Sequence, residues 1–548
     1  MRIIFLGGAG EVGRNMTVFE HDGKILIVDA GLMFPGDEML GVDLVLPDFE
    51  YLRGKADSVV GVMLSHGHED HIGAVPYLLK EINVPVYGGE ITLGLLERKL
   101  EEHRILDSTD LRPVKAPCSI DIGPFHLDLY PVVHSIPDAV ATVISTSAGR
   151  ILYTGDFKLD PDPVDGPPTD LEGLGKAAEK GIDVMLADST NSDEPGKTPP
   201  ERIVRDALAA VIRDAPGRVI IACFASHLQR IQQIILAAES CGRMVCLLGR
   251  SMSGNSEVAR RLGHLQVRDE MLVSPDEADL LPENRLVIVS TGAQGEPLSA
   301  LSLMAARDHR TIDLHSGDTV VLAATPIPGN ESAVNRVIDG LYRIGCRVIT
   351  PPQHNVHVSG HASADDLELM IKTISPRWFV PVHGEYRMLA GNAALARKVG
   401  VPGDRILICE DGDVLELQDG RLSKVDRIEA GYVLVDGFGI GDVHDEVLRD
   451  RRILADDGVV VCVVTIDAQT GELLAGPDLI SRGFVIEDEA EDFLEEARAE
   501  IRQSLASLAE DEITDWTAVR RAVRRSLGKL VAKRTGRRPM LLPVVMEV

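Results

Sequence analysis

The chain has few cysteines, few aromatic residues and no long apolar run. Its 548 residues include seven cysteines, an odd number, scattered with no two at metal-ligand spacing. A disulfide framework is therefore not expected, and free thiols suit a reducing cytoplasm. No apolar run is long enough to cross a bilayer, and the N-terminus lacks the charged and cleavable regions of a signal peptide. We expect a cytoplasmic protein without membrane association.

Positive charge is also scarce. The chain has 56 Lys and Arg residues against 85 Asp and Glu residues, a net charge of −29. Nucleic-acid-binding proteins usually show a basic footprint, so composition alone favours RNA no more than a small-molecule substrate. Bound cations would neutralise part of this charge, and local fields matter more than the total.

Histidine and aspartate are concentrated in one short run. Residues 65–71 hold three histidines and two carboxylates, after an apolar stretch at 59–64 that predicts a strand and before a helical pattern at 72–82. Nitrogen and oxygen donors of this kind suit zinc or manganese. A solvated polar loop is the alternative, but so many ligand types at one strand end favour a metallohydrolase.

Further ligand candidates follow other predicted strands. His134 follows the apolar run at 125–133, Asp156 follows 151–155, and His383 follows 378–382. Each alone is a weak signal, because a lone histidine after a strand is more often structural. Together they provide what a paired-metal site needs: another histidine for each metal and one bridging carboxylate.

These motifs resemble the metallo-β-lactamase superfamily. The likeness rests on the glycine-rich turn at 7–13, the run at 66–71, His134, Asp156 and His383. The motifs at 188–191, 291–297 and 357–361 are similar to those of its nucleic-acid-processing β-CASP branch, and within it to the bacterial ribonuclease J family. The resemblance spans nearly the whole chain.

Length and resemblance together predict several domains of the α/β class. The family implies a metallo-β-lactamase αββα sandwich, an inserted parallel-sheet β-CASP domain and a small C-terminal α/β domain. We expect the sandwich at 1–200 and 356–440, the insertion at 201–355, and a linker with the C-terminal domain at 441–548. Thr198 is a candidate N-cap for the first inserted helix. The tail predicts strand, helix, helix and strand at 458–466, 488–508, 516–534 and 540–545.

The resemblance implies a role for each candidate ligand. One zinc would be held by His66, His68 and His134, the other by Asp70, His71 and His383, and Asp156 would bridge them. Two divalent ions, zinc or manganese, would clamp a phosphodiester and activate a bridging water as hydroxide. The family places His361 beside the scissile phosphate, so His361 is the predicted general acid. Asp188 would orient it, although a purely structural role at a strand end is the alternative.

The resemblance also implies an RNA substrate. The expected activity is 5′-to-3′ exonuclease and endonuclease cleavage in rRNA processing and mRNA decay, and the sequence does not weigh one against the other. Histidine at 361, where DNA-processing relatives tend to have valine, favours RNA. A preferred 5′-monophosphate would be bound by Ser226, His227, His357, Val358, Ser359, Gly360 and His361.

Partners and a further ion follow from the same resemblance. The C-terminal domain of such proteins supports self-association, which implies a homodimer or homotetramer, with other RNA-decay proteins as further partners. The cations between Arg520 and Arg534 form a basic face, either solvated or in contact with RNA or a subunit. Asp43 and Asp436 match positions where relatives can hold a structural calcium, with simple turn residues as the alternative.

Two other classes of function remain. A small-molecule metallohydrolase of the glyoxalase or lactonase type would share the run at 66–71 but would not explain the insertion or the motif at 357–361. A noncatalytic RNA-binding scaffold would be expected to lose ligands, whereas all seven are present.

Overall fold

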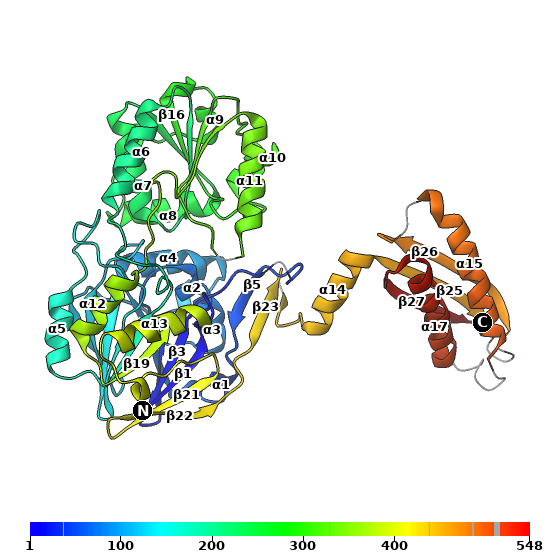
Figure 1. Cartoon of the computed structure of the whole chain (residues 1–548), viewed down its shortest axis with the longest axis horizontal. Helices are drawn as coiled ribbons and strands as arrows, with labels where there is room; N and C mark the ends of the chain where they lie inside the picture. Colours follow the sequence, from blue (N-terminus) through cyan, green and yellow to red (C-terminus); the bar gives the residue numbers. More distant parts are fainter. Residues whose placement is uncertain are drawn as a thin grey trace. The chain divides into compact units, whose positions relative to one another are not determined.

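The computed structural model describes residues 1–36, 38–327, 329–437, 439–467, 470, 472–484, 487–508 and 516–548. These residues form two compact units. The large unit holds Met1–Phe34 and Val45–Val433, and the C-terminal unit holds Pro35–Leu44 and Leu434–Val548 (Figure 1). Within the described residues, no helix combines the length and apolar character needed to span a membrane.

Two sheets build the base of the large unit. The first has the order β22 (Arg421–Arg427), β21 (Asp413–Gln418), β1 (Arg2–Gly7), β3 (Met16–His21), β4 (Lys24–Val28), β6 (Val59–Met63), β7 (Val86–Gly88), β8 (Leu111–Pro113). The second has the order β19 (Trp378–Val382), β13 (Val184–Asp188), β12 (Gly149–Tyr153), β11 (Val140–Thr146), β10 (Phe125–Pro131), β9 (Cys118–Ile122). Side chains of both sheets, among them Phe5, Leu26 and Phe125, pack into one buried cluster between them.

Helices cover the outer faces of these sheets. On the second sheet, α5 (Leu171–Glu179), α12 (Ala364–Ile374) and α13 (Tyr386–Lys398) contribute Leu174, Leu367 and Ala393 to a cluster with Phe379. On the first sheet, α4 (Glu90–Glu102) contacts β7 and β8. The predicted αββα sandwich is confirmed. Shorter elements are β2 (Ala9–Gly10), β5 (Leu44–Pro47), α1 (Glu50–Arg53), β20 (Gly384–Glu385), β23 (Tyr432–Asp436) and β24 (Gly439–Ile440).

A separate parallel sheet is inserted between β13 and β19. Its order is β15 (Met244–Leu248), β16 (Leu286–Ser290), β14 (Val219–Ala222), β17 (Thr319–Leu322), β18 (Arg347–Ile349), and every pair is parallel. The central strands are short apolar runs, as expected for parallel strands covered on both faces. The cover comes from α6 (Arg202–Asp214), α7 (Leu228–Ser240), α8 (Arg250–Arg261), α9 (Pro275–Ala278), α10 (Ala300–Ala306) and α11 (Glu331–Ile344), which surround the sheet in Figure 1. The predicted inserted parallel sheet is confirmed.

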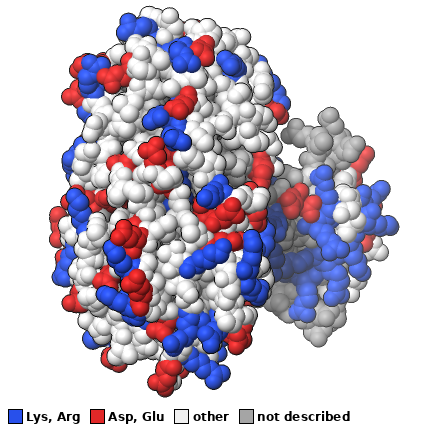
Figure 2. All heavy atoms as spheres, turned by 60° about the vertical axis from the view of Figure 1, so that its left-hand side comes forward, with Lys and Arg blue, Asp and Glu red and all other residues white. Residues whose placement is uncertain are grey.

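The C-terminal unit contains a sheet of order β26 (Leu473–Arg482), β25 (Val459–Ile466), β27 (Met540–Glu547). Alternate residues of β25 are buried under α15 (Glu487–Ala506) and α17 (Trp516–Thr535), and α14 (Asp445–Asp457) precedes the sheet. Lys and Arg side chains gather on the face of this unit shown in Figure 2. The predicted order of elements was wrong in omitting β26, because glycine, proline and charged residues weaken its strand pattern.

Two local predictions also differ from the structure. The helix expected at 72–82 is divided into α2 (Glu69–Ile72) and α3 (Val75–Glu81), so Asp70 and His71 lie on a short helix after the strand. Thr198 is not an N-cap, since α6 begins at Arg202. Its hydroxyl instead donates to the carbonyl of His361 at 2.8 Å, and Thr198 thereby braces the loop that carries this histidine.

Candidate metal centre

Three imidazoles and one carboxylate meet beyond the strand ends of the large unit. His66 and His68 follow β6, His134 follows β10, and Asp156 follows β12. One ligand atom of each lies within 4.8 Å of all the others. His68 Nδ1 is 3.0 Å from both His66 Nε2 and His134 Nε2. The nitrogen lone pairs of this first group therefore converge on one point, as in a metal site.

A second group lies beside the first and shares Asp156 with it. Its other members are Asp70, His71 and His383, again with ligand atoms within 4.8 Å of one another. His71 Nε2 is 3.2 Å from Asp156 Oδ2, and His383 Nε2 is 3.3 Å from Asp70 Oδ2. His383 Nδ1 is 3.4 Å from the other oxygen, Asp156 Oδ1. The Asp156 carboxylate thus faces both groups.

The imidazoles of the first group are held neutral. Burial lowers the pKa of His66 and of His134 well below the ordinary value, and neighbouring imidazoles lower it further. Burial also lowers the pKa of His68, to about 4. A neutral imidazole keeps the lone pair that a metal ligand needs.

The second group is governed by its carboxylates. Burial lowers the pKa of His383, but the surrounding aspartates outweigh burial and raise it to about 10. The pKa of His71 is likewise raised well above its ordinary value, because three carboxylates act against its burial. The raised pKa of both histidines reflects the concentration of buried carboxylates, whose charge divalent cations would also neutralise. The donor set of the two groups fits divalent cations.

Asp29 orients one ligand from outside the centre. His71 Nδ1 lies 2.8 Å from Asp29 Oδ2, which also accepts a hydrogen bond from the Tyr153 hydroxyl at 3.0 Å. Such a bond fixes the ring so that its other nitrogen faces the Asp156 carboxylate. The sequence prediction missed Asp29, although it directly follows β4 and so repeats the strand-end pattern of the ligands.

Two further histidines, His383 and His134, are oriented by a hydroxyl and a carbonyl. Thr190 Oγ1 is 2.8 Å from His383 Nδ1, and the Gly360 carbonyl is 2.9 Å from His134 Nδ1. A Cβ on Gly360 would lie 2.8 Å from the His134 ring, so only glycine permits this approach. Thr190 belongs to the motif at 188–191, but no role could be predicted for it, because its contact with His383 forms only in the folded chain.

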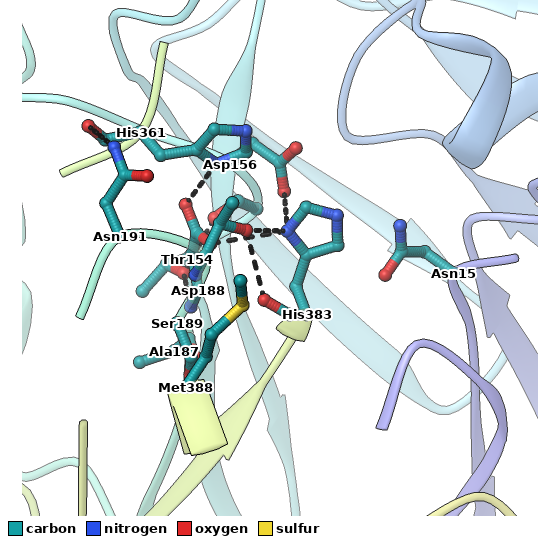
Figure 3. A network of polar contacts seen from close by, with 12 residues as sticks. Asn15, Thr154, Asp156, Ala187, Asp188, Ser189, Asn191, His361, His383 and Met388 are labelled. Atoms are coloured by element: carbon teal, nitrogen blue, oxygen red, sulfur yellow. Dashed lines mark hydrogen bonds and ion pairs between the residues drawn. The ribbon is translucent and has the colours of Figure 1, made fainter. Parts of the chain in front are cut away.

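His361 lies next to the second group. Its Nδ1 is 2.8 Å from Asp188 Oδ2, and Asp188 Oδ1 is 3.3 Å from His383 Nδ1 (Figure 3). The rings of His361 and His383 are stacked, with centroids 5.4 Å apart. Burial lowers the pKa of His361, but the Asp188 carboxylate outweighs burial and raises it. The structure therefore places an imidazole with a raised pKa beside the candidate metal centre.

Comparisons with known proteins extend over the whole chain. Residues 9–217 match the metallo-beta-lactamase superfamily, and residues 216–341 match the ribonuclease J beta-CASP domain. Residues 349–405 match the Zn-dependent metallo-hydrolase RNA specificity domain, and residues 446–548 match the ribonuclease J C-terminal domain. The chain is 45% identical over 549 residues to Ribonuclease J of Mycolicibacterium smegmatis, covering 100% of this chain and 97% of that protein. The chain belongs to the ribonuclease J family.

Other comparisons agree with this family. The chain is 40% identical over 548 residues to Ribonuclease J2 of Bacillus subtilis, covering 100% of this chain and 99% of that protein. A crystal structure of a protein of unknown function from Enterococcus faecalis V583 has a TM-score of 0.53 at 16% identity. It covers 75% of this chain and 99% of that chain, and it supports the fold alone. The predicted resemblance to ribonuclease J is confirmed.

The predicted phosphate-binding residues of this ribonuclease J family chain lie in two loops. Val358, Ser359 and Gly360 lead into His361, and Ser359 Oγ accepts a hydrogen bond from the His361 backbone N–H at 3.1 Å. Ser226 and His227 follow β14 of the inserted sheet. Ser226 is partly exposed, whereas Val358 and His227 are buried.

Arg230 joins these two loops. Its NH2 lies 3.2 Å from His227 Nε2, and its NH1 donates to the Val356 carbonyl at 3.0 Å. Burial lowers the pKa of His227 well below its usual value and that of His357 to about 3, with Arg230 adding to both effects. Among the described residues, the Nδ1 atoms of both histidines are buried without a hydrogen-bond partner. In folded proteins such atoms are usually satisfied by an ordered water or a bound ion.

The two aspartates predicted to bind calcium have protein partners. Asp43 Oδ2 accepts a hydrogen bond from the Gly437 N–H at 2.8 Å, and Asp436 forms an ion pair with Arg451. The arginine supplies the positive charge that an ion would bring, so these contacts favour the turn alternative. Calcium at this position stays a prediction.

Proposed function

We propose that this chain is a metal-dependent ribonuclease that removes nucleotides from the 5′ end of RNA and also cuts internally. The observation that carries the proposal is the contact of the His361–Asp188 pair with the ligand group around His383. It sets a proton donor beside two ligand groups that share one carboxylate. Membership of the ribonuclease J family supports RNA as the substrate.

The proposed metal is zinc. One ion would be held by His66, His68 and His134, and the other by Asp70, His71 and His383, with Asp156 between them. Imidazole and carboxylate ligands are typical of zinc sites, and manganese accepts the same donors. When bound, two such cations supply charge neutralisation at the phosphodiester and Lewis-acid activation of water.

His361 would complete the reaction as general acid. Asp188 holds Nδ1, which leaves Nε2 free to donate its proton to the departing 3′ oxygen. Hydrolysis consumes one water, breaks the bond between phosphorus and the 3′ oxygen, and leaves a 3′-hydroxyl on the released nucleotide. The next nucleotide keeps the phosphate. Each cut therefore regenerates the 5′-monophosphate end from which the next cut starts.

The terminal phosphate would lie between the two loops joined by Arg230. Ser359 offers a hydroxyl, and His227 and His357 offer buried Nδ1 atoms without protein partners among the described residues. As neutral imidazoles, both can donate a hydrogen bond from Nδ1 to a phosphate oxygen. A 5′-triphosphate is larger and more highly charged, so we expect it to enter this pocket poorly.

The products of 5′-labelled RNA test this function. We expect early release of a labelled mononucleotide, faster from 5′-monophosphate than from 5′-triphosphate RNA, and loss of cleavage after chelation. Longer labelled fragments would report internal cuts. Turnover of a lactone or a thioester without cleavage of RNA would instead support the small-molecule hydrolase. Equal rates on the two RNA ends would contradict the phosphate pocket.

A further inference from the structure

Helix α17 carries a block of positive charge without acids. The helix has seven Lys and Arg residues and no Asp or Glu, in a chain of net charge −29. All seven are exposed: Arg520, Arg521, Arg524, Arg525, Lys529, Lys533 and Arg534. They belong to the unit on which Figure 2 shows a face rich in Lys and Arg. The local field of this helix is therefore opposite in sign to the net charge of the chain.

Four of these cations form a ridge along one side of α17. Residues four apart lie on the same helix face, about 6 Å apart along the axis. The buried residues of α17, such as Val523 and Leu527, face the core with α15 and the sheet, on the opposite side of the helix. Like charges at this spacing destabilise a helix. We call the four cations spaced four residues apart the α17 ridge: Arg521, Arg525, Lys529 and Lys533.

The α17 ridge is not neutralised by the described part of the chain. Other cations of the helix have partners, since Arg534 pairs with Glu496 at 2.5 Å and Arg524 donates to the Leu541 carbonyl at 3.5 Å. Neither an ion pair nor a hydrogen bond joins a ridge side chain to any residue that the structure describes. Within the described residues this repulsion is uncompensated, and the charge of the ridge is complementary to that of a polyanion.

An exposed aromatic ring begins the same helix. Trp516 is one of two tryptophans in the chain and is 50% exposed. The Arg520 guanidinium carbon lies 4.5 Å from the centre of its ring. Single-strand-binding proteins combine cations that follow the phosphates with aromatic side chains on which bases stack. Trp516 at the start of α17 and the α17 ridge from Arg521 onward provide both kinds of contact on one element, at different positions around the helix axis.

We propose that the α17 ridge and Trp516 bind single-stranded RNA outside the active site. This inference rests on the proposed function, in which RNA is the substrate. A second copy of the chain is the less suitable occupant, because a two-fold interface centred on the ridge would bring the ridge against itself. The ridge would then meet like charges, which costs association free energy. RNA instead gains from each cation, and a long RNA held at two sites is bound more tightly than at one.

The test neutralises the ridge in the full-length holoenzyme. The variant combines Arg521→Gln, Arg525→Gln and Lys529→Gln, which keep helix propensity while removing charge. The ligand is a long phosphorothioate-linked single-stranded RNA, which keeps the backbone charge and resists hydrolysis. We expect about tenfold weaker binding at low salt. The slope of log affinity against log salt should fall in magnitude by about 2, because each single-strand phosphate contact contributes about 0.7.

A matched control removes the same charge from other elements of the same unit. Arg449→Gln, Arg482→Gln and Arg502→Gln change exposed residues of α14, β26 and α15 and should leave the salt slope near that of the wild type. Trp516→Leu should weaken binding, and Trp516→Phe should restore most of it. On long RNA the ridge variant should raise KM with little change in kcat, and on a short oligonucleotide both should stay unchanged.

Three results would overturn the inference. The first is an equal salt slope in the ridge and control variants while RNA cleavage stays normal, which would leave the proposed function intact. The second is a change of oligomeric state in sedimentation with RNA affinity unchanged, which would assign the ridge to a protein contact. The third is a wild-type holoenzyme that neither binds nor cleaves RNA, which would remove the proposed function as well.

Discussion

The two ligand groups of the metal centre share Asp156 but present different chemistry. The first group consists otherwise of imidazoles whose pKa is lowered by burial, so it offers neutral lone pairs. The second contains the Asp70 carboxylate and two histidines whose pKa is raised by the surrounding aspartates, so carboxylates dominate its electrostatics. Equal numbers of ligands therefore do not make equivalent sites. We expect a cation at the first to depend mainly on imidazole donors, and one at the second to depend more on carboxylate charge.

The largest effect is expected where the two groups meet. Asp156→Ala removes a carboxylate that faces both, so metal content should fall at both sites and RNA cleavage should be abolished. Elemental analysis of the purified variant, together with turnover of labelled RNA, checks this. Two metals per chain with normal turnover would contradict the shared role of Asp156.

A change confined to the second group should separate the sites. His383→Val removes one ligand of that group and leaves the three imidazoles of the first untouched. Metal content should fall toward one per chain, with cleavage lost because the second cation is needed. Competition with a graded series of chelators measures the remaining site. Equal weakening of both sites would show that the two groups do not bind independently.

The next largest loss of RNA cleavage is expected in a variant that keeps both cations. His361→Asn should lower RNA cleavage by about 10²- to 10⁴-fold with normal metal content, the usual range for a lost general acid. An activated aryl phosphodiester, whose leaving group needs no proton, should still be hydrolysed at nearly the wild-type rate. Asp188→Asn should resemble His361→Asn on both substrates. A similar loss on the aryl substrate would assign His361 to substrate binding or to metal retention.

The smallest effect, a loss of metal affinity at one group, is expected for a residue that contacts only one of the proposed ligands. Asp29→Asn keeps the shape of the side chain but weakens its bond to His71, so metal affinity of the second group should fall by about 10- to 100-fold. The first group should keep its affinity. Calorimetric metal titration resolves the two steps, and a melting curve of the metal-free variant controls for unfolding. A parallel loss at both sites would remove the distinction between the groups.

The site residues that could be predicted from the sequence are histidines and aspartates that directly follow predicted strands. His134, Asp156 and His383 follow apolar runs, so their place at the edge of a sheet could be inferred before any pairing was known. Asp29 obeys the same rule, but a lone aspartate after a strand is too common to stand out. Thr198 and Thr190 could not have been assigned, because their partners lie far away in sequence and meet them only in the folded chain.

Local sequence propensity also failed to predict secondary structure where tertiary contacts determine it. The strand β26 contains glycine and proline and is formed through its pairing with β25 rather than through its own preference. The short helix α2 ends at Ile72, and a Cβ on the following Gly73 would collide with Leu32, so close packing requires glycine at this position. The phosphate-binding role of Ser226, His227 and His357 stays a prediction. The buried Nδ1 atoms of the two histidines, which have no hydrogen-bond partner among the described residues, support it.

The insertion between β13 and β19 also determines the order in which the two ligand groups are completed during synthesis. These strands are neighbours in one sheet, yet Asp188 and His383 are 195 residues apart in the chain. The first ligand group is complete once residue 156 has been synthesised, whereas the second must wait for residue 383. Prior folding of the inserted sheet shortens the loop that this pairing has to close. A nascent chain therefore carries only one complete ligand group until residue 383 has been synthesised, so a reaction that needs both groups can start only after that point.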